Sequence, residues 1–327
     1  MEFKYIDFPS AYGDMLFRFK VFGEKQDTRN GPALVFPSPV LLTIYQPTQR
    51  VISDPNRNAN PFFHVMETVW MLAGRMNPQW LYRFNKRMAE FADRGPLDSP
   101  VIWGAYGYRW LTHWGDQVSK VIDILKKDPN SRQAVLTMWD PHLDLGTNHK
   151  DRPCNTHIYF RKEGPSLTMT VCNRSNDFVW GMMGANAVHL TYLHETIATS
   201  VGMSVGTYRV FTNNLHFYTE LYPNTDQIWE SADMTYSVYD RGVFDEAPPC
   251  RPEPILAPNE TFRQLSQDCR CFLRGAFEMI NNKWLLSTAL PMYLVYTENA
   301  SPETIKAEDW KEASKQWLQR NRKDAII

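Results

Sequence analysis

The stretch DRPCNTHIYF, residues 151–160, places a cysteine directly after a proline and ahead of an alternating, strand-like run. A catalytic thiolate needs nearby cations or helix-end amides that lower the thiol pKa. Arg132, Arg152 and Arg174 stand close in sequence or near predicted strand ends. Their planar guanidinium groups can bind a phosphate dianion and lower the pKa of the Cys154 thiol. The competing interpretation is a small buried thiol among solvated surface charges.

The segment CNRSNDFVWGMMGANAVHL, residues 172–190, concentrates polar side chains between a predicted strand and a predicted buried helix. Such groups often only cap a helix, and Asn186 is a candidate N-cap. One cap does not need so many polar residues, however. An asparagine amide carries both an acceptor and donors, so it can also read the edge of a pyrimidine. The polar residues of this segment are Asn173, Arg174, Ser175, Asn176, Asp177 and Asn186.

Composition and net charge limit the kinds of ligand and partner that the protein can bind. The chain has 327 residues and a formal net charge of -1, which gives no electrostatic support for duplex nucleic acid or an anionic membrane as partner. A small phosphorylated ligand needs only a few arginines and stays open. No apolar run is long enough to span a membrane, and MEFKYIDFPS lacks signal-peptide features. Five irregularly spaced cysteines without a C-x-x-C pair predict free thiols, no metal site and a cytoplasmic protein.

Hydrophobic periodicity predicts the elements that would position these residues. Helices are predicted over residues 60–74, 78–93, 116–128, 186–202, 260–282 and 302–321. Strands are predicted within residues 16–52, 132–140, 156–162, 166–175 and 206–218. The pattern indicates an α+β body over residues 1–220, with one sheet and long helices packed on it. Residues 221–327 would form a divergent C-terminal elaboration of the same single domain, 1–327.

In chain order, seven pieces resemble the thymidylate synthase family, including its pyrimidine nucleotide hydroxymethylase branch. They are ETVWMLAG, GAYGYRW, SRQAVLTMWDP, PCN, RSNDFVWG, NAVHLTYLHETIA and NNLHFY. The most diagnostic are the Pro-Cys pair and Arg-Ser-x-Asp followed by glycine. The resemblance implies a thymidylate synthase-like fold, with a mixed β-sheet, long packed helices and extra C-terminal helices. It also implies a homodimer.

The resemblance implies a role for each matching position in nucleotide binding. Cys154 would add to C6 of a pyrimidine nucleoside monophosphate, because C5 is a poor nucleophile until C6 is saturated. Arg132 would reach the phosphate across the dimer interface. Asn186 would read the base. The other implied nucleotide ligands are Arg174, Ser175 and Arg29 at the phosphate, and His216 and Tyr218 at the sugar hydroxyl.

The implied cofactor is 5,10-methylenetetrahydrofolate, which would donate the one-carbon group to C5. Asp177 matches the family residue that contacts the folate pterin. Glu67 matches the glutamate that organises water and protons, and Tyr106 a tyrosine of the proton-transfer network. An ionised carboxylate on the apolar face of the helix over 60–74 needs partners, which favours a functional Glu67. In contrast, His64 of the predicted helix over 60–74, and His189 and His194 of the one over 186–202, are interpreted as packed or satisfied histidines.

Departures from the family pattern bear on the product. The synthases usually carry histidine where this chain has Asn155, and tryptophans where it has Met88 and Phe91. The chain also lacks the usual short synthase tail, and the loop from Gly181 to Asn186 is longer by one residue. A lost aromatic wall and an altered lid would admit water, which favours 5-hydroxymethylation of dUMP. Thymidylate synthesis from dUMP and hydroxymethylation of dCMP or CMP stay open, although Asn186 favours uracil.

Two other classes of function compete with this reading. A thiol hydrolase would pair Cys154 with His157, three positions on in the predicted strand that follows. It would leave the arginines unexplained. A catalytically inactive nucleotide-binding or RNA-binding relative is the second. The low net charge argues against RNA, and the presence of Cys154, Glu67 and Asp177 argues against an inactive protein.

Overall fold

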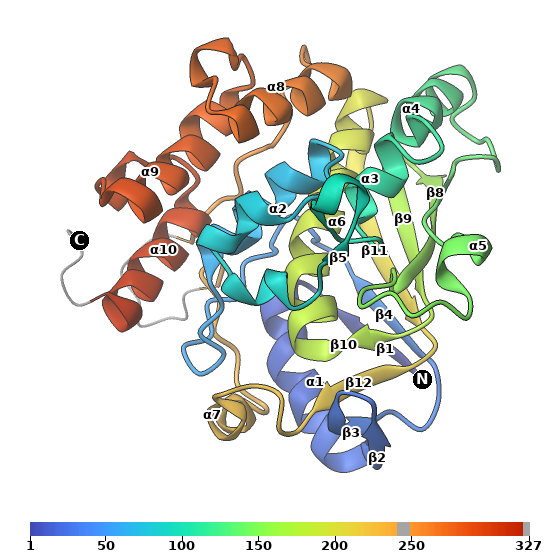
Figure 1. Ribbon diagram of the computed structural model, residues 1–327, viewed down its shortest axis with the longest axis vertical. Coiled ribbons are helices and arrows are strands. Elements are labelled where there is room, and N and C mark those ends of the chain that lie inside the picture. The colour runs from blue at the N-terminus through green and yellow to red at the C-terminus, as the bar shows by residue number, and fades with distance from the viewer. Residues whose placement is uncertain (241–248, 323–327) are drawn as a thin grey trace.

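The computed structural model describes residues 1–240 and 249–322 (Figure 1). Its main layer is a six-stranded mixed sheet in which β1 pairs in parallel with β4, and β11 with β9. The remaining neighbours are antiparallel. The strand order is β1 (Glu2–Tyr5), β4 (Val40–Ile44), β11 (Ser204–Thr212), β9 (Ser166–Asn173), β8 (Asn155–Glu163) and β7 (Val135–Thr137).

A second sheet makes the expectation of a single sheet incomplete. A short turn after β11 passes the chain from the first sheet into the second, where Asp177 stands beside His216 in register. The order is β10 (Asn176–Asp177), β12 (Leu215–Tyr218), β3 (Gly31–Val35) and β2 (Glu24–Thr28). A further pair is β5 (Asp93–Arg94) with β6 (Pro100–Val101).

Two helices form the centre of the helical layer. α6 (Asn186–Ser200) is buried from Asn186 to Ala198, so both its faces are covered, and α2 (Pro61–Leu72) packs on it. Gly74 ends the α2 segment with φ +70°, as its predicted stop requires. The other helices before residue 220 are α1 (Phe8–Phe22), α3 (Tyr106–Leu111), α4 (Gln117–Lys127) and α5 (Pro141–Asp144).

Helix α1 corrects the prediction that residues 16–52 form only strands. Asp7 caps the helix by accepting from the backbone N–H of Ser10 at 2.8 Å, and Pro9 occupies its first turn. Leu16 and Phe19 are then carried into the core. The strand prediction holds only from β2 onward.

The helix predicted over 78–93 is also wrong in form. Two short 3₁₀ segments occupy it instead, η1 (Gln79–Arg83) and η2 (Lys86–Ala89). Asn85 lies between them and accepts from the backbone N–H of Arg87 at 3.1 Å. This hydrogen bond caps the start of η2, so the two segments do not join into one helix. Both segments border the cleft described below.

The chain beyond residue 220 is largely helical, shown in orange and red in Figure 1. Three of its helices, α8, α9 and α10, pack against α2 on the side away from the six-stranded sheet. The helices are α7 (Thr225–Glu230), α8 (Phe262–Arg274), α9 (Leu290–Glu298) and α10 (Glu308–Asn321). Short 3₁₀ or π turns are η3 (Pro96–Asp98), η4 (Phe178–Ala185), η5 (Phe277–Met279), η6 (Leu285–Ala289) and η7 (Pro302–Thr304).

Buried polar contacts tie this C-terminal part to the body. Glu195 of α6 pairs with Arg50 and also accepts from the backbone N–H of Ile255 at 2.9 Å. Trp310 of α10 donates to the Tyr192 hydroxyl at 2.7 Å. The C-terminal part is therefore an integral part of the fold.

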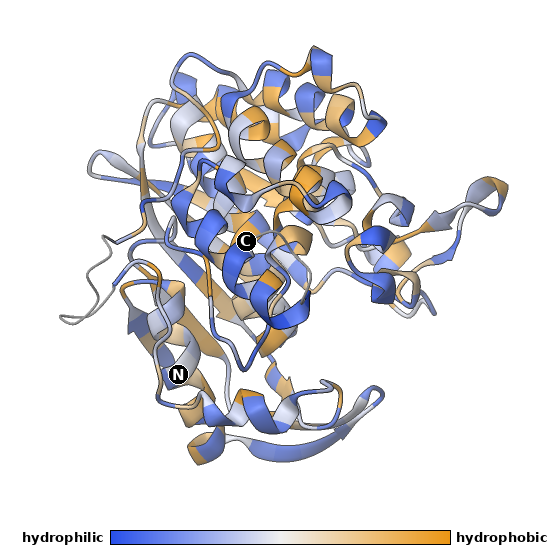
Figure 2. Ribbon diagram, turned by 90° about the vertical axis from the view of Figure 1, so that its left-hand side faces the viewer, coloured by the Kyte–Doolittle hydropathy of each residue, from blue (hydrophilic) through white to orange (hydrophobic). Residues whose placement is uncertain are grey.

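The buried apolar side chains of both parts form one continuous cluster. Figure 2 shows hydrophobic positions gathered where helices and strands face one another, with hydrophilic positions toward the outer turns. The core therefore runs without a break from the body into the C-terminal part, and the single domain over residues 1–327 stays a prediction. Within the described residues, no helix combines the length and the apolar character needed to cross a membrane.

Candidate active site

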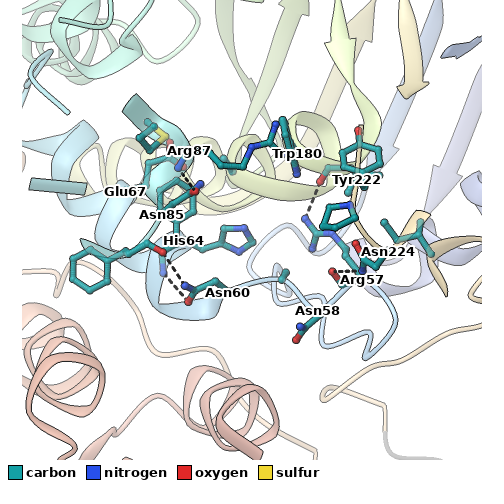
Figure 3. A pocket seen from close by; sticks show the side chains of 18 of the residues that line it. Arg57, Asn58, Asn60, His64, Glu67, Asn85, Arg87, Trp180, Tyr222 and Asn224 are labelled. Atoms are coloured by element: carbon teal, nitrogen blue, oxygen red, sulfur yellow. Dashed lines mark hydrogen bonds between the residues drawn. The ribbon is translucent and has the colours of Figure 1, made fainter. Parts of the chain in front are cut away.

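Two adjoining pockets form one cleft beside α2 and α6. The smaller, about 190 Å³, contains Cys154 and is called here the cysteine pocket. The larger, about 390 Å³, is lined by aromatic and polar side chains and is called the aromatic pocket (Figure 3). The two pockets share four of their lining residues, Glu67, Met88, Phe91 and Ala185. The shared wall makes the two pockets neighbouring compartments of one site.

Cys154 is a free thiol that directly precedes β8, and its carbonyl accepts from the backbone N–H of Arg174 at 3.0 Å. Burial raises the pKa of the thiol to about 11, because the thiolate loses its hydration. The Arg174 and Arg29 guanidinium groups act in the predicted direction and lower the thiol pKa. Asp151 and Asp177 oppose them. The arginines therefore act on the thiol pKa as expected, but burial outweighs them and the pKa lies above its ordinary range.

Tyr106, in the first turn of α3, stands beside the cysteine. Burial raises the pKa of its hydroxyl well above the usual range, and the nearby Cys154 adds to this. The backbone N–H of Asn155 donates to the Tyr106 hydroxyl and acts in the opposite direction. The Asp151 carboxyl lines the same pocket, and burial raises its pKa to about 6. No sequence pattern singled out Asp151.

The hydrolase alternative has no support in the structure, because His157 lies outside the cysteine pocket. A β-bulge shifts the β8–β9 register between Asn155 and His157. The His157 ring stacks on Tyr159 with centroids 6.2 Å apart. His157 is not a lining residue of either pocket.

Glu67 lies at the junction of the two pockets. Asn60 caps α2 by accepting from the backbone N–H of Phe62 at 3.0 Å, which sets the turn that carries Glu67 inward. The Glu67 side chain is 7% exposed, and its Oε2 lies 3.8 Å from Nδ1 of His189. Among the described residues, neither that oxygen nor either ring nitrogen of His189 has a hydrogen-bond partner. His189 is therefore packed, as one half of its interpretation has it, but its ring nitrogens are not satisfied within the described residues.

The other two histidines differ from His189. His194 is buried and its Nε2 lies 2.6 Å from the carbonyl oxygen of Leu167, as expected for a structural residue. His64 lines the aromatic pocket, where burial and the nearby Arg57 lower its pKa to about 3. A neutral imidazole is the form that this pocket favours.

Asn186 lines the cysteine pocket from the first turn of α6. It is not the N-cap, because Ala185 occupies that position without a side-chain cap. Its Nδ2 donates to Oδ1 of Asn176 at 3.3 Å. A Cβ at Gly181 would lie 2.1 Å from the same oxygen, so the glycine of the RSND…G motif makes room for this amide pair.

Asp177 caps the π turn η4 rather than lying free in a pocket. Its carboxylate accepts from the backbone N–H groups of Val179 at 2.7 Å and Trp180 at 3.1 Å, and from the Tyr222 hydroxyl at 2.6 Å. Burial raises the pKa of the Asp177 carboxyl, while the hydrogen bond from Tyr222 and the nearby His216 lower it. The contact with Tyr222, forty-five positions away, had no sequence signal.

His216 and Tyr218 come from β12, two residues apart and on one face. Their rings meet edge to face with centroids 4.8 Å apart, and His216 Nδ1 lies 3.0 Å from Oδ1 of Asn214. Tyr218 accepts from Nδ2 of Asn30 at 3.2 Å. Because Asn30 follows Arg29 in the β2–β3 turn, this bond ties the turn that carries the exposed Arg29 to β12.

The remaining predicted phosphate ligands differ in position. Arg174 is exposed and donates to the carbonyls of Pro153 at 3.1 Å and Arg152 at 3.2 Å, next to the cysteine. Ser175 follows it in the same turn. Arg132 is exposed ahead of β7 and lines neither pocket. Of the predicted site residues, Cys154, Glu67, Tyr106 and Asn186 line the cleft, whereas the others lie outside the lining of both pockets: Arg29, Arg132, Arg174, Ser175, Asp177, His216 and Tyr218.

The aromatic pocket has more aromatic wall than the sequence indicated. Phe91 meets Trp180 edge on at 6.4 Å between centroids, and Trp180 meets Tyr222 in the same way at 5.2 Å. The Arg87 guanidinium lies 4.0 Å from the Trp180 ring centroid, and Figure 3 shows the two side by side. The expected loss of an aromatic wall is thus only partial, at Met88.

The thymidylate synthase family model matches residues 57–236, and the chain belongs to that family. It is similar to a deoxyuridylate hydroxymethyltransferase of Pseudomonas phage M6, at 35% identity over 95% of this chain and 92% of the relative. A deoxyuridylate hydroxymethyltransferase of Bacillus phage SP01 is 34% identical over 75% of this chain and 65% of the relative. A putative thymidylate synthase of Methanothermobacter marburgensis is 36% identical over 35% of this chain and 50% of the relative. The predicted family and α+β class are confirmed.

Proposed function

We propose that this enzyme converts dUMP to 5-hydroxymethyl-dUMP with 5,10-methylenetetrahydrofolate, through a covalent bond between Cys154 and C6. The two phage relatives that cover most of this chain carry the matching name. The observation that carries the proposal is the position of Glu67. Its buried carboxylate, with one unpartnered oxygen, lies where the two pockets join. A carboxylate there can hold water at the carbon being transferred.

The cysteine pocket suits a pyrimidine nucleotide. The Cys154 thiolate adds to C6, and the electron pair moves toward O4, which makes C5 nucleophilic. Arg174, Arg29 and Ser175 would hold the phosphate at the mouth of this pocket. Because burial favours the neutral thiol, the thiolate forms only as it adds to the base. The Tyr106 hydroxyl beside the thiol is suited to relay the C5 proton.

Base and sugar recognition would come from opposite sides of the cysteine pocket. His216 and Tyr218 of β12 would bond the sugar hydroxyl. Asn186 can present its carbonyl oxygen to the N3–H of uracil and an amide N–H to O4. Cytosine has the reverse pattern at these two atoms, so the favoured base is uracil.

The aromatic pocket fits the folate. A pterin is a flat ring with N–H donors, and Phe91, Trp180 and Tyr222 supply ring faces and edges that can pack on it. Asp177 fixes two of these elements through its bonds to Trp180 and Tyr222. When bound, the folate supplies the one-carbon unit for C5. Met88 and Phe91 then separate the two ligands at the shared wall.

Two sources of residues beyond the cleft complete the proposal. Arg132, outside both pockets of its own chain, would reach the phosphate of a second copy in a homodimer. Tyr159 and Phe211 on the six-stranded sheet are 45% and 40% exposed, which suits a covered face. Residues 221–327 would be an elaboration of the family body that braces α2, and with it Glu67.

A mixture of Arg132→Ala and Cys154→Ala chains tests the shared site. In a mixed dimer, one site receives both an intact thiol and Arg132 of the partner subunit. Random mixing would then restore about a quarter of the parent activity, since half the dimers are mixed and each has one working site. Each variant alone serves as the control. Absence of recovery after subunit exchange would count against the shared site.

The test of the reaction itself is incubation with methylenetetrahydrofolate and either dUMP or dCMP. We expect a product with the mass of 5-hydroxymethyl-dUMP and no rise in dihydrofolate absorbance. Dihydrofolate with a methylated product would establish thymidylate synthesis instead, an alternative favoured by the Phe91–Trp180 wall. Turnover of dCMP would show that Asn186 reads cytosine.

A further inference from the structure

His189 is a buried histidine without a structural partner. It lies on α6 and is 2% exposed. Within the described chain, neither ring nitrogen has a hydrogen-bond partner. Leaving two polar ring atoms unpaired in the interior costs folding free energy, so such a group calls for another reason to be there. His194, five positions further along the same helix, has the bond to Leu167 that His189 lacks.

The surroundings of His189 are those of a reaction site. Glu67, from α2, brings Oε2 to 3.8 Å from Nδ1, a distance too long for a direct hydrogen bond. Tyr106, from α3, meets the imidazole edge on with centroids 5.7 Å apart. Both residues line the cysteine pocket together with His189 and Cys154. The imidazole and the carboxylate thus converge on the pocket from two different helices.

The position on α6 also fits the proposed nucleotide pose. His189 follows Asn186 by three residues, so the two side chains lie on one face of the helix, one turn apart. If Asn186 reads the O4 and N3 edge of uracil, the next turn faces the C5 side of the base. The residue after the cysteine is Asn155, whose fully buried side chain offers no imidazole.

We propose that His189 is a further catalytic residue, the general base that deprotonates the water attacking the C5 methylene carbon, with Glu67 as its partner. This inference rests on the proposed hydroxymethylation. The water oxygen forms a bond to the methylene carbon, and the C5=CH₂ electron pair moves into the C4–O4 enolate. The water proton passes to a ring nitrogen of His189 and from there to solvent. The enolate then re-forms C5=C6 and expels the Cys154 thiolate, which releases the product.

The Glu67 carboxylate gives this base its support. An imidazolium formed 3.8 Å from a carboxylate gains a favourable charge interaction and can close the gap to a hydrogen bond. The arrangement resembles other sites in which an acidic side chain orients an imidazole and stabilises its protonated form. Glu67 then acts on water both directly and through His189.

The test compares His189→Asn and His189→Gln with His194→Asn, the matched buried histidine on the same helix. The first assay is 5-hydroxymethyl-dUMP formation from dUMP and methylenetetrahydrofolate. The second assay needs no folate: Cys154 adds to C6 of 5-bromo-dUMP, dithiothreitol takes the bromine, and dUMP and bromide are released with oxidised dithiothreitol. The third adds 2-mercaptoethanol to the first, and measures how much methylene carbon the thiol traps as a thioether in place of water.

Loss of a general base for water costs about 100-fold or more in hydroxymethylation. We expect that loss in both His189 variants, with bromide release within about threefold of the parent and a larger thioether share. His194→Asn should keep the parent's product ratio. Equal losses in both assays, or unchanged hydroxymethylation, would overturn the role of His189. A parent chain that makes dihydrofolate and thymidylate would instead overturn the proposed function, and this is seen without any variant.

Discussion

The two pockets of the cleft are built in different ways. The cysteine pocket takes most of its chemical groups from regular elements: Asn186 and His189 from α6, Glu67 from α2, and Cys154 from the residue before β8. The aromatic pocket shares α2 but is otherwise lined mainly by loops and by short 3₁₀ and π turns, at residues 57–60, 84–91, 179–185 and 222–224. Rigid elements hold the groups that must meet the reacting atoms within a narrow tolerance. Irregular segments form the compartment that decides what shares the site with the nucleotide.

The strongest test of the chemical role of the cysteine pocket is to remove its nucleophile. Cys154→Ser leaves a hydroxyl that is a far weaker nucleophile, so both hydroxymethylation and folate-free bromide release should fall roughly 10⁴-fold or more. Steady-state rates and bromide measurements check this. Cys172→Ser, a partly exposed cysteine of β9 that lines neither pocket, should keep both activities. Bromide release that survived in Cys154→Ser would remove the cysteine pocket from the chemistry.

The pH dependence of thiol alkylation measures the electrostatics of the cysteine pocket. Burial disfavours the thiolate and raises the pKa of Cys154 to about 11. Alkylation by neutral iodoacetamide should therefore rise about tenfold per pH unit from pH 7 to pH 10, and level off only above about pH 11. Rates are measured by mass spectrometry of the Cys154 peptide.

A matched variant tests the cause of that profile. Arg174 lowers the thiol pKa, so Arg174→Gln should move the midpoint to higher pH. Saturating dUMP should protect Cys154 in the parent chain. A plateau near pH 8.5, the range of an ordinary thiol, would show that the pocket is wetter than its geometry indicates.

A substitution at Asp177 tests whether the aromatic pocket can be impaired while the cysteine pocket keeps its function. Asp177→Asn removes the negative charge that strengthens the hydrogen bonds from the backbone of Val179 and Trp180. It also replaces Oδ2, an acceptor for the Tyr222 hydroxyl, with an amide donor. Bonds to a charged group are worth about 1.5–3 kcal/mol, so folate-dependent turnover should fall about 10–100-fold, with a raised KM for folate. Folate-free bromide release should stay within a few-fold. A parallel fall in both assays would mean that the pockets act as one unit.

The contrast between regular elements and irregular segments also explains which features could be predicted from the sequence. Periodicity located α6 and β9 within a few residues, and motifs placed Cys154, Asn186 and Glu67 together, because these depend on local pattern and short motifs. The cap of Asp7 on α1 was also present in the sequence, but the strand prediction began beyond it. Such an error comes from the choice of element boundary.

Other features exist only in the folded chain. The bulge between Asn155 and His157 depends on pairing with β9, so the hydrophobic pattern within β8 does not predict it. The bond between Tyr222 and Asp177 joins distant segments. The unpartnered state of His189 depends on what α2 and α3 place around it, because a histidine in an apolar helix has the same local pattern whether satisfied or not.

The smallest expected effect concerns the wall that the two pockets share. Met88 and Phe91 line both, so a larger side chain at 88 should crowd the place where water meets the transferred carbon. Met88→Trp should slow hydroxymethylation a few-fold and yield detectable dihydrofolate with some methylated product. Met88→Leu, which keeps the volume, should give the parent's product and no dihydrofolate. If Met88→Trp slows hydroxymethylation without yielding dihydrofolate, the wall does not select between water and hydride, and selection belongs to Glu67 and His189 within the cysteine pocket.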